Sequence, residues 1–255
     1  MASKKRNKNK NKKDDWEELY DEIIDSVSEK LSVLECMVGL HWTLIRSENG
    51  TGLARTLAGD EDTFELHNIT GMPLKKLAGY MKSRNLLEAS LGLAAINSAL
   101  NHHDYIEEIS DPDNSNAFNN LVSAFEGKKV AMVGHFPMLE PLGDICELTV
   151  IDREAHDNVY SEAMGENILP DQDFVFITGT TFIYKTAPRL IELSKNATVT
   201  LLGPSVPLSR ILFNYGVNTL AGVVVTDESA LWQAVREGGR QNALDNGTQT
   251  IFIYR

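Results

Sequence analysis

Apolar positions near the start of the chain follow the spacing of a helix with one buried face. The stripe runs through Trp16, Leu19, Ile23, Val27 and Leu31, one residue every three or four positions. This periodicity predicts an amphipathic helix. Its apolar face would be covered either by the helix's own domain or by a second copy of the chain in a homo-oligomer.

Strand-like runs and a first short helix come next. Leu34–Ser47 is rich in residues that favour strands, and Gly50 and Gly52 mark a turn. Thr51–Leu57 is the candidate for a third strand. Pro73–Lys82 reads as a helix that begins on its proline.

A second helix, predicted over Leu86–Asn101, carries small residues on all sides. Neighbouring segments could therefore approach it closely. The polar breaker Asp111–Asn116 predicts a linker between two domains, and a helix around Asn116–Phe125 leads into the second. We expect a disordered basic tail over residues 1–13, a smaller α+β domain over residues 14–110 and a second domain over residues 117–255.

From residue 129 the pattern changes to short apolar runs separated by helical segments. Short buried strands joined by helical crossovers predict a parallel sheet covered on both faces. About 125 residues with five or six strands favour a doubly wound, mostly parallel, Rossmann-like α/β sheet. The predicted strands are Val130–Val133, Leu148–Ile151, Phe174–Ile177, Thr198–Leu202, Gly222–Val225 and Thr250–Tyr254. The predicted helices between them are Thr186–Ser194, Leu208–Phe213 and Glu228–Glu237.

Composition and charge exclude several classes of partner. No apolar run approaches the roughly eighteen residues of a membrane span, and no secretory signal begins the chain, so we expect a cytoplasmic protein. The net charge is −12. Residues 1–13 hold seven Lys and Arg and no acid, which leaves 17 basic against 36 acidic residues, or −19, for the rest. A body this acidic repels nucleic acid, whereas the basic tail could touch RNA or anionic lipid or serve only as a solubilising arm.

Cysteine and histidine give little support for a resident metal. Cys36 and Cys146 lie 110 positions apart, which suits a reducing compartment and argues against structural zinc or a disulfide framework. None of the six histidines has the helical spacing of paired metal ligands, and His102–His103 reads as a pair at a helix C-terminus. The sequence predicts no metal site and assigns no cofactor.

Candidate binding chemistry gathers where the predicted parallel strands end. In a doubly wound sheet, ligands bind beyond the carboxyl ends of the strands, so the residues after each strand form one candidate site. His135 is the histidine predicted there, and histidine can transfer protons near neutral pH, although a structural role is the simpler reading. The candidate binding residues are Gly134, Phe136, Pro137, Asp152, Arg153, Thr178, Gly179, Thr180, Thr181, Gly203, Pro204 and Ser205.

Each of these loops has an ordinary structural alternative. Gly134 would let a ligand approach the backbone, but the sequence has no Gly-x-Gly-x-x-Gly fingerprint of a dinucleotide site. Asp152, eighteen positions later, could bind a ribose hydroxyl, as in an adenosylmethionine site, or cap the next turn. The hydroxyls of Thr178–Thr181 could hold a carboxylate, a phosphate or a polar ring edge, or cap a helix.

The first domain offers an acid of its own. Glu88 lies one turn into the small-residue helix beside Leu87 and Ala89, and partial burial would suit it to acid/base catalysis. The alternative is a favourable charge near a helix N-terminus. Asn97 and Asn101 share part of that face, and a buried Asn97 would need a hydrogen-bond partner.

Short segments along residues 20–255 match a single pattern in order. In the second half they are Val133–Pro137, Val150–Glu154, Ile177–Thr181, Leu202–Ser209, Tyr215–Val217 and Gly222–Asp227. In the first half they are Val38–Gly39, Trp42–Thr43, Gly50–Leu53 and Glu88–Asn97. With these segments the chain resembles the bacterial and archaeal family of putative heavy-metal chelation proteins.

The resemblance implies a domain like the N-terminal domain of enolases, packed on a Rossmann-like domain, with a site built by both. The resemblance makes Glu88 and Asn97 stronger candidates for the site, alongside His135, Asp152 and the Thr178–Thr181 loop. The family pattern commonly has Asn where this chain has Tyr184. The implied activity is condensation or hydrolysis of a pterin-, flavin- or siderophore-like compound, with Glu88 or His135 moving protons. The alternative is a non-catalytic carrier or sensor of a metal–chelate complex; in both cases the partner is a small molecule, a metal chelator or its precursor.

Overall fold

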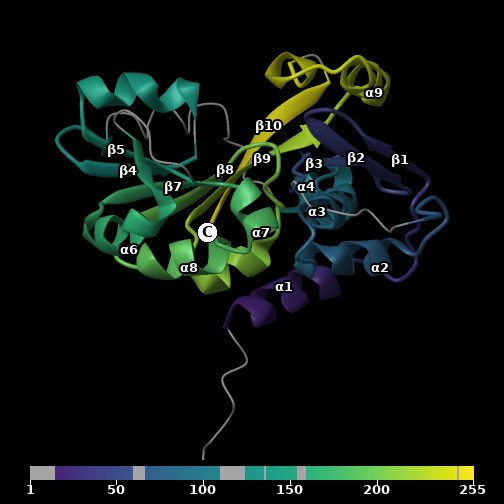
Figure 1. Cartoon of the computed structure of the whole chain (residues 1–255), viewed down its shortest axis with the longest axis horizontal. Coiled ribbons are helices and arrows are strands. Elements are labelled where there is room, and N and C mark those ends of the chain that lie inside the picture. The colour runs from purple at the N-terminus through teal and green to yellow at the C-terminus, as the bar shows by residue number, and fades with distance from the viewer. Residues whose placement is uncertain (1–14, 60–66, 110–123, 135, 154–158, 246) are drawn as a thin grey trace, which may run out of the picture.

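The computed structural model contains two β-sheets of different kinds (Figure 1). It describes residues 15–59, 67–109, 124–134, 136–153, 159–245 and 247–255. The smaller sheet has three antiparallel strands, and the larger sheet has seven strands that are mostly parallel. This is the mixed α/β class that the hydropathy pattern predicts. The predicted tail over residues 1–13 and the predicted linker over Asp111–Asn116 lie outside the described residues.

The smaller sheet and its helices make up the N-terminal part. Its strands are β1 (Glu35–Val38), β2 (Trp42–Ser47) and β3 (Gly50–Arg55), paired in that order. Its helices are α1 (Asp15–Asp25), α2 (Leu74–Ala78), the 3-10 helix η1 (Gly79–Lys82), α3 (Leu86–Leu100) and α4 (His103–Ile109). The predicted strands and the long small-residue helix are therefore confirmed.

Three expectations for this part are wrong in detail. Helix α1 ends at Asp25 rather than near Leu31, and the Ser26 hydroxyl donates to the Ile23 carbonyl at 2.6 Å, a bond that competes with helix continuation. Gly52 lies inside β3 rather than in a turn. His103 begins helix α4, which the sequence pattern did not predict.

Helix α3 is approached closely from more than one side, as its small residues predict. Residues 89–100 are all buried. A Cβ atom at Gly52 of β3 would lie 1.9 Å from the backbone nitrogen of Ser98, and one at Gly92 would lie 2.1 Å from that of Met81. Both contacts are with backbone, so the packing of β3 and η1 on α3 requires glycine at these positions.

The larger sheet is wound in two directions from a central strand. Its order is β10-β9-β8-β7-β4-β5-β6. The strands are β4 (Lys129–Val133), β5 (Glu147–Asp152), β6 (Val159–Ser161), β7 (Phe174–Thr178), β8 (Thr198–Leu202), β9 (Thr219–Val225) and β10 (Thr248–Tyr254). All neighbours are parallel except β9 and β10. The chain leaves β4 toward β5 and β6 and later returns to the other side of β4 with β7, which is the order reversal of a doubly wound sheet.

The helices of this part connect the strands. They are η3 (Pro137–Asp144), η4 (Glu162–Met164), α6 (Gly165–Ile168), η5 (Leu169–Asp171), α7 (Thr180–Tyr184), α8 (Ala187–Leu193), η6 (Arg210–Tyr215), α9 (Glu228–Arg236) and η7 (Gln241–Ala243). Two features differ from expectation. Strand β6 was not predicted because three residues are too few for a recognisable pattern, and the segment predicted as a helix over Leu208–Phe213 is a 3-10 helix shifted toward Tyr215.

One hydrophobic core runs through both parts of the chain. Ala131 and Val133 of β4 belong to a cluster that continues through α7 and α8 into α1 and α3, whereas Val130 and Met132 face the opposite side and pack with Phe125. This alternation is the two-residue period of a strand. Figure 1 shows α1 beneath α8 and α2, at the junction of the two parts.

The apolar stripe of α1 is covered within the chain itself. Leu19, Ile23 and Val27 are buried, and the Tyr20 hydroxyl donates to the Phe182 carbonyl of α7 at 2.8 Å. This stripe therefore packs on its own molecule rather than on a second copy. Among the described helices, none combines the length and apolarity needed to cross a bilayer.

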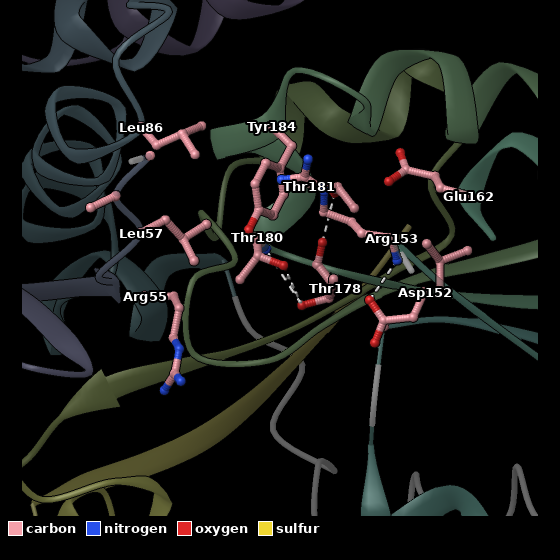
Figure 2. Close-up of a pocket in the computed structure, with 14 residues that line it drawn as sticks. Arg55, Leu57, Leu86, Asp152, Arg153, Glu162, Thr178, Thr180, Thr181 and Tyr184 are labelled. Atoms are coloured by element: carbon pink, nitrogen blue, oxygen red, sulfur yellow. Dashed lines mark hydrogen bonds between the residues drawn. The ribbon is translucent and has the colours of Figure 1, made fainter. Parts of the chain in front are cut away.

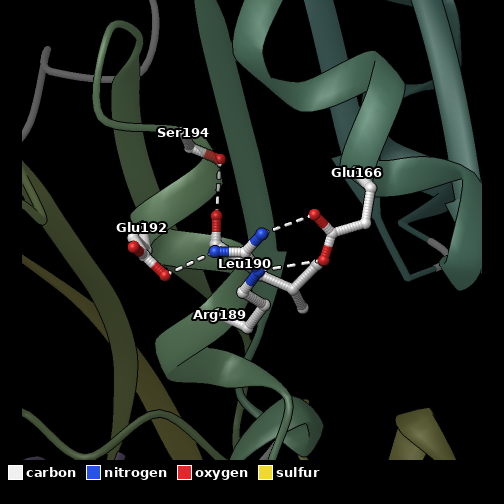
Figure 3. A network of polar contacts seen from close by, with 5 residues as sticks. All are labelled: Glu166, Arg189, Leu190, Glu192 and Ser194. Atoms are coloured by element: carbon white, nitrogen blue, oxygen red, sulfur yellow. Dashed lines mark hydrogen bonds and ion pairs between the residues drawn. The ribbon is translucent and has the colours of Figure 1, made fainter. Parts of the chain in front are cut away.

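An exposed ion-pair network joins α6 to α8 (Figure 3). Arg189 donates from Nε and Nη2 to the Glu166 carboxylate at 2.9 and 2.5 Å, and from Nη1 to Glu192 at 2.6 Å. The hydrogen bonds from Arg189 lower the pKa of Glu166. Both partners are about half exposed, so solvent screens most of the attraction.

This network should make a small contribution to stability that depends on pH. Because the pKa of Glu166 is lower in the folded chain, the stabilisation is complete above the ordinary carboxyl pKa and is lost as the pH falls through the folded value. We expect Glu166→Gln to unfold at a slightly lower temperature than the native chain at neutral pH, and this difference in unfolding temperature to be smaller near pH 3. Thermal unfolding at both pH values measures this, and an equal gap at both would contradict it.

Candidate functional site

A pocket lies at the carboxyl edge of the larger sheet, where the strand order reverses at β4. Ligands of doubly wound sheets bind at this position. The pocket has a volume of about 890 Å³, within the range of small-molecule sites. Both parts of the chain line it (Figure 2), with Arg55, Leu57, Ala58, Gly59 and Leu86 from the N-terminal part and Val133, Gly134, Asp152, Arg153, Glu162, Thr178, Thr180, Thr181 and Tyr184 from the C-terminal part.

Six residues predicted from the sequence meet in this lining. They are Gly134, Asp152, Arg153, Thr178, Thr180 and Thr181. They lie at or just beyond the ends of three different strands, β4, β5 and β7, whose carboxyl ends adjoin in the sheet. Figure 2 shows Thr178 and Thr180 between Arg55 and Asp152.

The glycines at the strand ends make room for the protein's own side chains. Gly134 has a φ of 100°, and a Cβ there would lie 2.8 Å from the methyl carbon of Thr178. Gly203 has a φ of 112°, and its nearest neighbour is the Phe136 ring. Both glycines therefore adopt a left-handed conformation that other residues rarely adopt, and Gly134 brings Thr178 against the pocket wall.

The threonine loop presents hydroxyl groups to the pocket. Thr178 Oγ1 accepts hydrogen bonds from the Thr180 backbone nitrogen at 3.4 Å and from Thr180 Oγ1 at 3.2 Å, so its own proton can be donated to a ligand. Thr181 donates to the Thr178 carbonyl at 2.6 Å. Gly179 occupies the N-cap of α7 and supplies no side chain, but Thr178 Oγ1 accepts from the backbone nitrogen of Thr180, the first residue of that helix, so a threonine does take part in capping it. Helix α7 has only five residues, so the hydroxyls, not a helix dipole, are the groups available for binding.

An arginine and a tyrosine stack at one wall of the pocket. The guanidinium carbon of Arg153 lies 3.7 Å from the centre of the Tyr184 ring, a cation–π contact. Asp152 Oδ1 accepts from the Arg153 backbone nitrogen at 2.7 Å, which is the turn-capping role considered for this residue, and its side chain also lines the pocket. The Tyr184 ring thus positions the Arg153 guanidinium.

The N-terminal part contributes a second arginine. Arg55 ends β3, its backbone nitrogen donates to Ser205 Oγ at 2.9 Å, and its guanidinium lies 5.4 Å from the centre of the Trp42 ring. Burial lowers the pKa of Arg55, and the nearby Arg240 lowers it further. Within the described residues no carboxylate forms an ion pair with Arg55 or Arg153.

The side chains of Glu88 and Asn97 make hydrogen bonds within the N-terminal part and do not line the pocket. Glu88 accepts from the Ser83 hydroxyl at 2.6 Å, and its backbone nitrogen donates to Asn85 at 3.0 Å, so it belongs to the capping of α3. Leu86, one half-turn earlier, lines the pocket in its place. Asn97 is buried and donates to the Leu53 carbonyl at 2.8 Å, and its Oδ1 has no partner among the described residues.

The remaining candidates lie outside the lining or outside the described residues. Phe136, Gly179, Gly203, Pro204 and Ser205 do not line the pocket, although Ser205 accepts a hydrogen bond from the lining residue Arg55, and Pro137 begins η3. The proton-transfer candidate His135 lies outside the described residues.

Sequence reasoning missed several lining residues. Glu162 directly follows β6, the strand too short to be recognised. Arg55 is the single charged residue of the apolar run Thr51–Leu57, a signal that could have marked it. Across the described ranges, no three His, Cys, Asp or Glu side chains come together as a metal site.

The fold and the pocket define a Rossmann-like α/β protein with a candidate ligand site between its two parts. A family model described as "Putative heavy-metal chelation" matches residues 116–253, and a second model with the same description matches residues 20–100. The chain belongs to this heavy-metal chelation family.

Solved and curated relatives agree with this assignment. A crystal structure of a protein of unknown function from Desulfitobacterium hafniense is 36% identical, with a TM-score of 0.84, 93% of this chain covered and 98% of that chain. A second crystal structure, of a protein of unknown function from Pyrococcus horikoshii, is 21% identical and has a TM-score of 0.77. The match covers 94% of this chain and 99% of that chain, and at this identity it supports the fold alone. An uncharacterized protein of Methanocaldococcus jannaschii is 26% identical over 198 residues, which cover 74% of this chain and 71% of that protein.

Proposed function

We propose that the pocket binds a small, planar, anionic molecule of the chelator type, and that this binding is the chain's part in heavy-metal chelation. The observation that carries the proposal is the pair Arg55 and Arg153, which line one pocket from the two parts of the chain. Neither has a carboxylate partner in the described part of the chain. Guanidinium groups bind carboxylates and phosphates through paired hydrogen bonds, so an anionic ligand supplies the missing partners.

The rest of the wall suits a planar ligand with polar edges. The Tyr184 ring and the side chains of Leu57 and Leu86 offer apolar contact, and Thr178 and Thr180 offer hydroxyl groups. Chelator-type molecules combine these features, since carboxylates and ring nitrogens are the atoms that hold their metal ions.

Acid/base chemistry in the same pocket is a second candidate. The carboxylates of Asp152 and Glu162 line the pocket, whereas Glu88 is engaged by Ser83. Condensation or hydrolysis of a pterin-, flavin- or siderophore-like compound would therefore use Asp152 or Glu162 to move protons. In that case Asp152→Asn should keep ligand affinity and lose turnover.

Titration calorimetry with defined chelators tests the binding proposal. The probes are pterin-6-carboxylate and pyridine-2,6-dicarboxylate, each alone and as its nickel complex, beside free nickel. We expect saturable binding of the chelators and a loss of about tenfold or more in affinity for Arg153→Ala, because a charge-assisted pair is removed. Arg210→Ala is the matched control, since Arg210 is exposed and lies outside the pocket lining.

Two results would count against the proposal. One is an affinity for the chelators that is equal in the native chain and in Arg153→Ala. The other is saturable binding of free nickel with no binding of either chelator, which would indicate direct metal binding by side chains.

A further inference from the structure

A third arginine, Arg240, adjoins the pocket beside Arg55. Arg240 follows α9, and both Arg240 and Arg55, which ends β3, contact Trp42. The side chain of Arg240 also contacts His41, which precedes β2. Arg240 Nε donates to His41 Nε2 at 3.2 Å. The three residues come from separate segments, so only the folded chain brings them together.

The position of Arg240 is held from two directions. The indole nitrogen of Trp42 donates to the Arg240 backbone carbonyl at 3.0 Å, and His41 accepts from its side chain. The same Trp42 ring lies beneath the guanidinium of Arg55. One aromatic residue therefore positions both arginines, and within the described residues the terminal nitrogens of Arg240 have no hydrogen-bond partner, so they are available as donors.

The charges in this cluster repel one another. Burial lowers the pKa of Arg55, Arg240 lowers it further, and Tyr184 acts in the opposite direction. Partial burial and then the charges of Arg55 and Arg240 lower the pKa of His41, so His41 is neutral at pH 7 and can accept the hydrogen bond from Arg240. In the parts of the chain that the structure describes, no carboxylate pairs with Arg55 or Arg240.

Two like charges held together in an acidic protein point to an anion that is bound between them. The chain carries a net charge of −12, and an exposed arginine would ordinarily find a carboxylate among so many acids. Here the fold instead places Arg240 on the same tryptophan, Trp42, as Arg55, which is one of the two arginines that line the pocket. A bound anion would remove the repulsion and receive hydrogen bonds from both guanidinium groups.

We propose that Arg240 and Arg55 form a second anion subsite adjoining the pocket, so that the pocket's ligand carries two separate anionic groups. Arg153 binds one group and the pair Arg55 and Arg240 binds the other. Either group is a carboxylate or a phosphate, because both accept paired hydrogen bonds from a guanidinium. The inference rests on the proposed function, since the first anionic group occupies the pocket described above.

Calorimetry with three ligands built on one benzene ring tests the subsite. Benzoate has one anionic group, benzene-1,4-dicarboxylate has two carboxylates, and 4-carboxyphenyl phosphate has a carboxylate and a phosphate. In the native chain we expect at least one of the doubly anionic ligands to bind about tenfold or more tightly than benzoate. The ligand with the larger gain identifies the second group as carboxylate or phosphate.

Substitutions at Arg240 then separate charge from packing. Arg240→Met keeps the aliphatic stem and should abolish the gain from the second anionic group, measured in each variant as the ratio of the affinity for the doubly anionic ligand to the affinity for benzoate. Arg240→Lys keeps the charge without the planar fork and should retain part of the gain. Arg210→Met is the matched control, and thermal unfolding of each variant reports whether it folds as the native chain does.

The outcomes distinguish the two proposals. Suppose that benzoate binds to the native chain and binds more weakly to Arg153→Ala, but that neither doubly anionic ligand binds more tightly than benzoate. The subsite is then overturned and the proposed function stands. If the gain persists in Arg240→Met, the subsite is also overturned. If none of the ligands binds saturably to the native chain, the proposed function and the subsite fail together.

Discussion

Replacing Asn101 with alanine is expected to lower the free energy of unfolding by roughly 4 kcal/mol. The side chain lies just beyond the end of α3 and is 4% exposed. Its Nδ2 donates to the carbonyls of Val206 and Val223 at 2.9 and 3.2 Å, and its Oδ1 accepts from the Leu208 backbone nitrogen at 2.9 Å. Alanine would leave three buried backbone groups without this partner, and each such group costs about 1–3 kcal/mol.

The same side chain ties the N-terminal part to the larger sheet. Val206 and Leu208 follow β8, and Val223 lies in β9, so one residue bridges α3 and two segments that are distant in sequence. Urea unfolding at equilibrium measures the loss. Asn196→Ala is the matched control, because Asn196 is exposed and its side chain makes no hydrogen bond within the described residues. A loss below about 1 kcal/mol for Asn101→Ala would mean that water or local rearrangement satisfies these groups.

Gly52→Ala is expected to destabilise the chain by roughly 3 kcal/mol or more, because the added methyl group has no space. The new Cβ would lie 1.9 Å from the Ser98 nitrogen and 2.4 Å from the Ala94 carbonyl oxygen. These atoms belong to the backbone of α3, which cannot turn aside as a flexible side chain could. Helix α3 would have to move away from β3, and that movement would open the core that both parts of the chain share.

Gly79→Ala provides the control for this substitution. Gly79 begins η1 with a φ of −57°, and nothing lies within 4 Å of a Cβ built there. Alanine at this position should be neutral or stabilising by up to about 1 kcal/mol, because it reduces the freedom of the unfolded chain. Urea unfolding of both variants makes the comparison. Similar stabilities for the two would contradict the close packing of β3 on α3.

The strand pattern of the C-terminal part could be predicted because strand formation there depends on local sequence. Buried parallel strands are short apolar runs, and each of the six predicted runs corresponds to a strand. Strand β6 has three residues and a mixed composition, so its pairing with β5 depends on the neighbouring strand rather than on its own sequence. Glu162, which follows β6, could not be predicted for the same reason.

The residues of the candidate site also fall into those that the sequence could predict and those that it could not. Gly134, Asp152 and Thr178 could be named because a residue at the end of a parallel strand has its position set by that strand. Arg55 could not, since its place in the pocket depends on how β3 packs against the loop that carries Ser205. Glu88 was favoured on a helix whose hydropathy does not distinguish its faces, and the contacts with Ser83 and Asn85 assign it to the helix start.

The sequence by itself determined the fold class, the order of most elements and the strand ends that line the pocket. These follow from hydrophobic periodicity and turn residues, which act over a few neighbouring positions. Only the tertiary structure decided that Arg55, Arg153 and Tyr184 line one pocket and that Arg240 and Arg55 both contact Trp42. Those neighbours lie up to about two hundred positions apart along the chain, and their meeting depends on packing that no local pattern encodes.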